Sequence, residues 1–170
     1  MRNLSVKILA VLGLALITVT GAQATGTGAS ATASATADII APIAIINISG
    51  STLAFGQIVP VAAGTVTVAT DGTRTFSGVQ IVPASPTTAA QFQVTGNPNN
   101  TFSITLPAST TISSGTNNMT VDAFTSNPTS TGTLDNTGNK TLNVGGTLHV
   151  AANQAIGHYT GTFAVTVAYN

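Results

Sequence analysis

The chain of 170 residues contains no cysteine and no tryptophan, and all 4 of its acidic residues are aspartates. Because no disulfide can form, the fold has to be stabilised by buried apolar surface and hydrogen bonds alone. Basic residues are as scarce, with lysine and arginine together numbering 4. So few positive charges exclude extensive contact with phosphates, and nucleic acid is not an expected partner. A surface of Thr, Ser, Asn, Gly and Ala also does little to oppose association between copies.

Sequence motifs that usually carry catalysis or bind cofactors are missing as well. No nucleophile elbow, phosphate-binding loop or dinucleotide-binding pattern occurs, so we predict neither an enzyme nor a cofactor site. His149 and His158 could meet across adjacent strands as metal ligands, but such histidines are more often ordinary surface residues, and we assign no metal site. Asp71 and Arg74 are expected to pair with each other across a hairpin.

Residues 1–24 have the composition of a secretory signal peptide. Arg2 and Lys7 supply positive charge, residues 8–19 are almost all apolar, and Ala22-Gln23-Ala24 offers small residues for cleavage. The apolar stretch is shorter than the roughly 20 residues that span a bilayer, and no later segment is longer. We therefore predict an exported chain whose mature form, residues 25–170, is one domain without a transmembrane segment.

Beyond the cleavage site, apolar residues recur with a period of two between turn signals, and no helical period is evident. This pattern predicts an all-β fold, an antiparallel immunoglobulin-like β-sandwich over residues 39–170. Asp71-Gly72 predicts a type I′ hairpin turn, and a second hairpin is expected to join residues 91–94 to residues 102–106. The polar residues 125–139 are expected to form a long loop. Gly145-Gly146 indicates either a bulge or a tight turn.

The last strand carries the most informative spacing. Alternate positions along it form one mostly apolar face, with the members Gly157, Tyr159, Gly161, Phe163, Val165, Val167 and the penultimate Tyr169. This spacing resembles the C-terminal motif of bacterial fimbrial subunits that are assembled by a periplasmic chaperone and an outer-membrane usher. In those subunits the strand borders a groove left open for a neighbour's strand. The resemblance implies that the sandwich is incomplete and is completed by donor-strand exchange.

A second alternating segment follows the cleavage site. Residues 25–38 carry alanine at alternate positions, at Ala29, Ala31, Ala33, Ala35 and Ala37. At about 3.3 Å per residue these positions span roughly 30 Å when extended, enough to follow one edge of a sandwich. The resemblance implies a donor strand that inserts into the next subunit. Two alternatives remain: a flexible linker, or a donor strand that continues into the larger Ile39 and Ile40.

Nearly all of the mature chain is also similar to a widespread family of exported bacterial domains of unassigned function. The similarity includes the sequences ATASATA at residues 31–37, PIAI at residues 42–45, Phe55-Gly56, MTVDAF at residues 119–124, VGGTL at residues 144–148 and YTGTF at residues 159–163. This resemblance implies a fold more firmly than an activity.

Two functional hypotheses follow. The first is a structural subunit of a surface fimbria, or pilus, that passes through the periplasm, is held there by a chaperone, polymerises with copies of itself and contributes to cell adhesion. The alternative is a monomeric secreted β-sandwich that binds carbohydrate or a host surface. The scarcity of aromatic residues argues against the alternative, because sugar-binding platforms usually need exposed rings.

Overall fold

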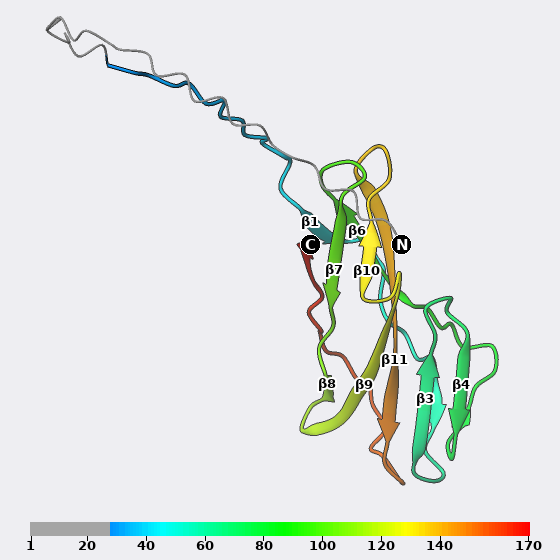
Figure 1. Ribbon diagram of the computed structural model, residues 1–170. Helices are drawn as coiled ribbons and strands as arrows, with labels where there is room; N and C mark the ends of the chain where they lie inside the picture. Colours follow the sequence, from blue (N-terminus) through cyan, green and yellow to red (C-terminus); the bar gives the residue numbers. More distant parts are fainter. Residues whose placement is uncertain (1–27) are drawn as a thin grey trace, which may run out of the picture. The chain divides into compact units, whose positions relative to one another are not determined.

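The computed structural model describes residues 28–170, in which every regular element is a β-strand (Figure 1). The strands are β1 (Ala44–Asn47), β2 (Ile58–Val59), β3 (Gly64–Val68), β4 (Arg74–Ser77), β5 (Gln80–Ile81), β6 (Ala90–Thr95), β7 (Thr101–Thr105), β8 (Ser109–Ser114), β9 (Asn117–Asn127), β10 (Thr131–Thr133), β11 (Asn139–Val150) and β12 (Thr166–Tyr169). All pairings between them are antiparallel. The predicted antiparallel all-β class is therefore confirmed.

Within the described residues, no helix is present that could cross a membrane. Residues 38–170 form one compact unit. Residues 28–37 are exposed and form no strand. The predicted signal peptide, residues 1–24, lies outside the described residues.

Two antiparallel sheets dominate the compact unit, beside a small β2–β5 ribbon. The larger sheet has the order β1-β6-β11-β3-β4, and β9 pairs with both β11 and β8; the smaller sheet has the order β10-β7-β12. The long strand β11 joins the two halves of the larger sheet, because its first half pairs with β6 and its second half with β3.

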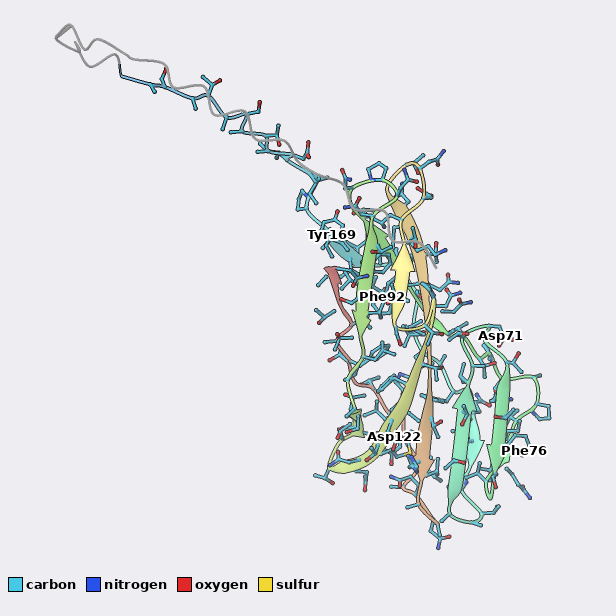
Figure 2. All side chains as sticks on the ribbon, viewed as in Figure 1. Asp71, Phe76, Phe92, Asp122 and Tyr169 are labelled. Carbon is cyan, nitrogen blue, oxygen red and sulfur yellow. The ribbon has the colours of Figure 1, made fainter. Side chains whose placement is uncertain are left out.

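Inward side chains of both sheets meet in one apolar core, which gives the fold its sandwich-like character. Val94 and Leu142 from the larger sheet pack with Phe102 from the smaller sheet, and all three are fully buried. A second cluster around Val66 and Leu148 lies under β3, β9 and the end of β11. Figure 2 shows that side chains fill the space between the strands, and Phe92 is one of them. Phe76 lies on the outer strand β4.

The predicted hairpin forms between β3 and β4, but its turn is not type I′. The Ala69 N–H donates to Thr73 O over 2.9 Å, so three residues lie between this pair. Only Gly72 among them has a positive φ, of 85°, whereas a type I′ turn needs positive φ at both central residues. Asp71 instead accepts the Thr73 N–H over 2.8 Å. The Asp-Gly signal fits loops of either length, which is why the predicted turn type is wrong.

The expected Asp71–Arg74 pair does not form either. The Arg74 guanidinium turns toward a neighbouring segment, where it donates to Phe55 O over 3.1 Å, Ser85 Oγ over 2.9 Å and Val82 O over 3.1 Å. A guanidinium has five N–H donors in a fixed fork and can donate to several oxygen atoms at once. These bonds together outweigh one contact with the exposed Asp71 carboxylate.

The second predicted hairpin is wrong, because β6 and β7 belong to different sheets. β6 lies between β1 and β11, whereas β7 lies between β10 and β12. Residues 96–100 therefore cross from one sheet to the other. Val94 and Phe102 point into the same core from opposite sides, and an alternating apolar pattern is the same in either arrangement.

The predicted loop over residues 125–139 contains the end of β9 and all of β10. β10 shows no apolar alternation because its inward residue is Gly132, which lies under the Phe102 ring.

Gly145-Gly146 lies at a bulge rather than a turn. Gly145 pairs with Thr125 and Thr147 with Asp122, so the extra residue is on β9, where Ala123 has a φ of 46°.

Candidate strand-accepting edge

Four of the seven residues that form the predicted apolar face of the final segment point into the core. Their side chains are partly buried there, and they are Phe163, Val165, Val167 and Tyr169. The residues between them are exposed. Phe163 fixes the start of this row, because its ring packs edge-on against Phe92 with 6.1 Å between centroids and lies 4.9 Å from the ring of Phe124.

Gly157 and Tyr159 do not belong to this row. The Tyr159 hydroxyl donates to Ala155 O over 2.7 Å and accepts from Gln154 Nε2 over 2.9 Å, so it closes a local loop. Gly157 is exposed. The strand β12 is accordingly shorter than predicted, and only the isolated Ser113–Thr160 bridge precedes it.

The outer side of β12 is the first half of the candidate site. The Asn170 N–H donates to Thr101 O of β7 over 3.3 Å. Because backbone groups alternate sides along an antiparallel strand, Val167 and Tyr169 direct their N–H and C=O groups away from β7. Among residues 28–170, no strand pairs with this side of β12.

The outer side of β1 is the second half of the candidate site. The Ile48 N–H donates to Gln91 O over 3.0 Å, and the same alternation directs the backbone groups of Ile45 and Asn47 away from β6. The Ile45 side chain packs into the same core as β12. We name the outward backbone groups of Ile45, Asn47, Val167 and Tyr169 the open edge. Sequence reasoning missed the β1 half, because alternation alone does not tell an outer strand from a central one.

The two halves of the open edge lie side by side (Figure 1), with Cα atoms of β1 and β12 within 8 Å of each other. A strand paired on both sides would need about 9.6 Å, twice the usual spacing between strands. Unless β1 moves, an added strand can therefore pair with β1 or with β12, but not with both.

The hydroxyl group of Tyr169 makes hydrogen bonds to two other segments near the open edge. The hydroxyl donates to Ala41 O over 2.8 Å and accepts the Asn97 N–H over 2.6 Å. The penultimate residue thus connects β12 to the segment before β1 and to the crossing that follows β6.

The candidate donor residues Ala29, Ala31, Ala33, Ala35 and Ala37 are all exposed and lie in no strand. Ile39 is 99% exposed and Ile40 46% exposed, so both isoleucines present apolar surface next to this segment. Its role as a donor strand stays a prediction.

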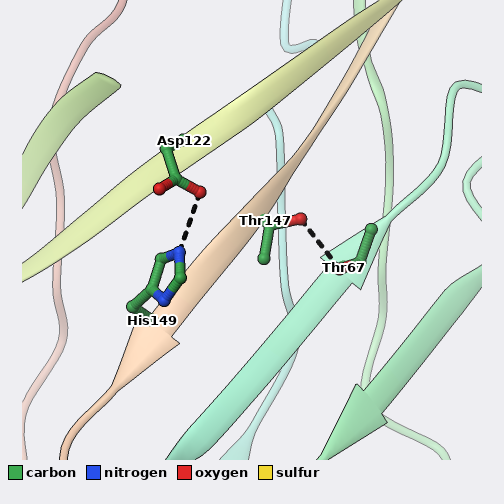
Figure 3. A network of polar contacts seen from close by, with 4 residues as sticks. All are labelled: Thr67, Asp122, Thr147 and His149. Carbon is green, nitrogen blue, oxygen red and sulfur yellow. Dashed lines mark hydrogen bonds and ion pairs between the residues drawn. The ribbon is translucent and has the colours of Figure 1, made fainter. Parts of the chain in front are cut away.

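A polar network on the outer face of the larger sheet involves one of the two histidines. His149 Nε2 and Asp122 Oδ1 are 2.8 Å apart, and the hydroxyls of Thr67 and Thr147 are also 2.8 Å apart (Figure 3). The side chains of His149 and Asp122 are 49% and 37% exposed, so their contact adds little to stability. His158 takes no part in this network, and residues 28–170 contain no group of three or more acidic or histidine side chains able to hold a metal ion.

Comparison with known proteins assigns the chain to a family. The family model described as a domain of unknown function (DUF4402) matches residues 46–169. The chain belongs to this family. No curated protein and no solved structure matches the chain. The predicted similarity to a family of unassigned function is confirmed to that extent. The DUF4402 region contains Val167 and Tyr169 of the open edge, whereas the alanine-rich residues 29–37 precede it.

Proposed function

We propose that the chain is a structural subunit of a surface fimbria, which polymerises by accepting a strand from another copy at the open edge. One observation supports this most directly: the outward backbone groups of Val167 and Tyr169 have no strand partner in the described chain. An uncovered strand edge is a template for pairing with another chain. Each hydrogen bond made there is worth about 1 kcal/mol net, and covering partly exposed core side chains adds about 25 cal/mol per Å².

The alanine-rich segment suits this edge as the donor. Its period of two would place the methyl groups of Ala29 to Ala37 toward the core and the hydroxyls between them toward solvent. In this proposal the sandwich is immunoglobulin-like and incomplete, a periplasmic chaperone covers the same edge before assembly, and an outer-membrane usher passes the subunits to the cell surface.

Two matched variants of the full-length chain test the donor assignment. Ala33→Asp places a charge at an inward position of the donor strand, and Ser34→Asp places the same charge at the neighbouring outward position. We expect Ala33→Asp to abolish polymers, because the carboxylate would be buried without a partner, and Ser34→Asp to leave them intact. Size-exclusion chromatography and electron microscopy of protein exported to the periplasm measure the difference.

The outcomes separate the alternatives. Equal assembly of both variants would mean that residues 29–37 are a linker. A wild-type chain that stays a stable, soluble monomer would favour the monomeric secreted binding module. In the assembled wild type, hydrogen exchange should slow at Val167 and Tyr169; unchanged exchange there would reject the proposed edge.

A further inference from the structure

The strand β4 forms a second border of the larger sheet, at the end of the strand order away from β1 (Figure 1). At the turn before β4, the Ala69 N–H of the β3 side donates to Thr73 O over 2.9 Å. Because backbone groups alternate sides along an antiparallel strand, Arg74 and Phe76 direct their N–H and C=O groups away from β3. Among residues 28–170, no strand pairs with this side of β4. We name the outward backbone groups of Arg74 and Phe76 the β4 edge.

The β4 edge lacks the features that usually keep edge strands apart. Such strands are protected by lysine, proline, bulges or a covering segment. β4 contains neither lysine nor proline, its register with β3 is continuous, and the nearby strand β5 pairs with β2 instead. The one charge of β4 is already engaged, because the Arg74 guanidinium donates to Phe55 O, Ser85 Oγ and Val82 O. An approaching strand therefore meets little resistance at this edge.

The surface around β4 is apolar and uncharged. Residues 57–63 and 75–83, which include β2, β5 and most of β4, contain no charged residue. Half of the exposed large hydrophobic side chains of residues 28–170 lie in these two segments, namely Phe76, Val59, Val61 and Val82. Exposed apolar side chains that gather in one region are typical of a contact with another molecule. An uncharged surface can also meet a copy of itself without repulsion.

We propose that the β4 edge pairs with the β4 edge of a second copy, antiparallel and about a two-fold axis. The register follows from the outward groups: Arg74 lies opposite Phe76 of the second copy, and Phe76 lies opposite Arg74 of the second copy. Every outward N–H and C=O of both strands then has a partner. Thr75 lies on the axis, opposite Thr75 of the second copy.

A second copy of β4 suits this edge better than the alanine-rich segment does. β4 spans four residues, or about 13 Å, whereas the alanines at 29–37 span roughly 30 Å. Phe76 pairs with the buried Val66 of β3, and paired side chains share a face, so its half-exposed ring lies at the margin of the core face. In the proposed register the two Phe76 rings are diagonal neighbours within reach of each other. Alanine methyl groups would leave most of each ring exposed.

This contact differs from the open edge in its symmetry. A two-fold contact closes after two copies, whereas acceptance of a strand from the next copy continues along a chain of subunits. The β4 edge would therefore join subunits of two neighbouring fibres side by side. Although one such contact is small, its repetition along two fibres strengthens the association.

Introduced cysteines test the proposal, because the chain contains none of its own. In Thr75→Cys, the two Cα atoms on the axis would be about 4.5 Å apart, within the range of about 4.4–6.8 Å that a disulfide needs. Thr120→Cys, at an exposed position of β9 between β8 and β11, is the control. The full mature variants are purified reduced, oxidised mildly with diamide and analysed on non-reducing gels.

We expect the Thr75→Cys dimer to form about tenfold faster than the Thr120→Cys dimer, because paired strands hold the thiols at an effective concentration far above that of the free chains. Equal rates would refute the contact. The rates can be read on monomers and on polymers alike, so they do not depend on strand exchange. Failure of the polymer proposal would appear in the Ala33→Asp experiment and not here.

Two further variants in the Thr75→Cys background test the register and the occupant. Phe76→Ser should slow cross-linking by about tenfold, because each pair buries two rings. Ile156→Ser removes a fully exposed isoleucine from another part of the surface and should leave the rate unchanged. An unchanged rate in Phe76→Ser would contradict the register. Disulfides between Thr75→Cys and Ala33→Cys chains, in place of Thr75→Cys dimers, would show that the alanine-rich segment occupies this edge and would overturn the proposal.

Discussion

Tyr169→Phe removes a single oxygen atom and tests how β12 is held at the open edge. The variant loses the bond donated to Ala41 O at 2.8 Å and the bond accepted from the Asn97 N–H at 2.6 Å. At about 0.5–1.5 kcal/mol for each neutral hydrogen bond, the free energy of unfolding should fall by about 1–3 kcal/mol. For a domain of this size the melting temperature should then fall by roughly 3–10 °C.

The other tyrosine of the chain is a matched control. The Tyr159 hydroxyl donates to Ala155 O, four residues away, whereas Tyr169 and Ala41 are 128 residues apart. Tyr159→Phe should therefore loosen only its own loop. Thermal unfolding followed by circular dichroism gives the stability of both variants, and hydrogen exchange over residues 38–47 reports the segment at β1. Equal losses of stability, or unchanged exchange in Tyr169→Phe, would refute the anchoring role of Tyr169.

Two further predictions concern stability. Gly132→Ala should destabilise the fold by about 1–3 kcal/mol in urea titrations, because a Cβ atom there would lie 2.8 Å from Cε1 of the buried Phe102; the same cost in a Phe102→Leu background would contradict this steric explanation. At Asp135, hydrogen bonds from the Thr137 hydroxyl and from the backbone N–H groups of Asn139 and Thr137 hold the carboxyl pKa below its usual value. This contribution to stability is present above about pH 4 and is lost as the pH falls through the lowered pKa. Asp135→Asn should reduce the drop in urea midpoint between about pH 5 and pH 2, and a drop as large as that of the wild type would rule out the linkage.

The orientation of the final segment could be predicted from sequence because it depends on local geometry. Side chains alternate between the two faces of an extended chain wherever that chain lies. The apolar positions from Phe163 to Tyr169 therefore identified the inward face, even though β12 covers only the last part of the segment. The hairpin of β3 and β4 is equally local, since its two strands are joined by a short turn.

The pairing partners of each strand could not be predicted in this way. Two strands joined by a short connection can pair with each other or face each other across the core, and both arrangements bury the same side chains. β6 and β7 face each other, which the alternation of Val94 and Phe102 does not reveal. β10 was missed because its inward residue, Gly132, is small and gives no apolar signal.

The sequence by itself determined the all-β class and the inward face of the final segment, since both depend only on the period of two along the backbone. The tertiary structure decided which edges have no strand partner within the described chain, because an edge is defined by strands distant in sequence.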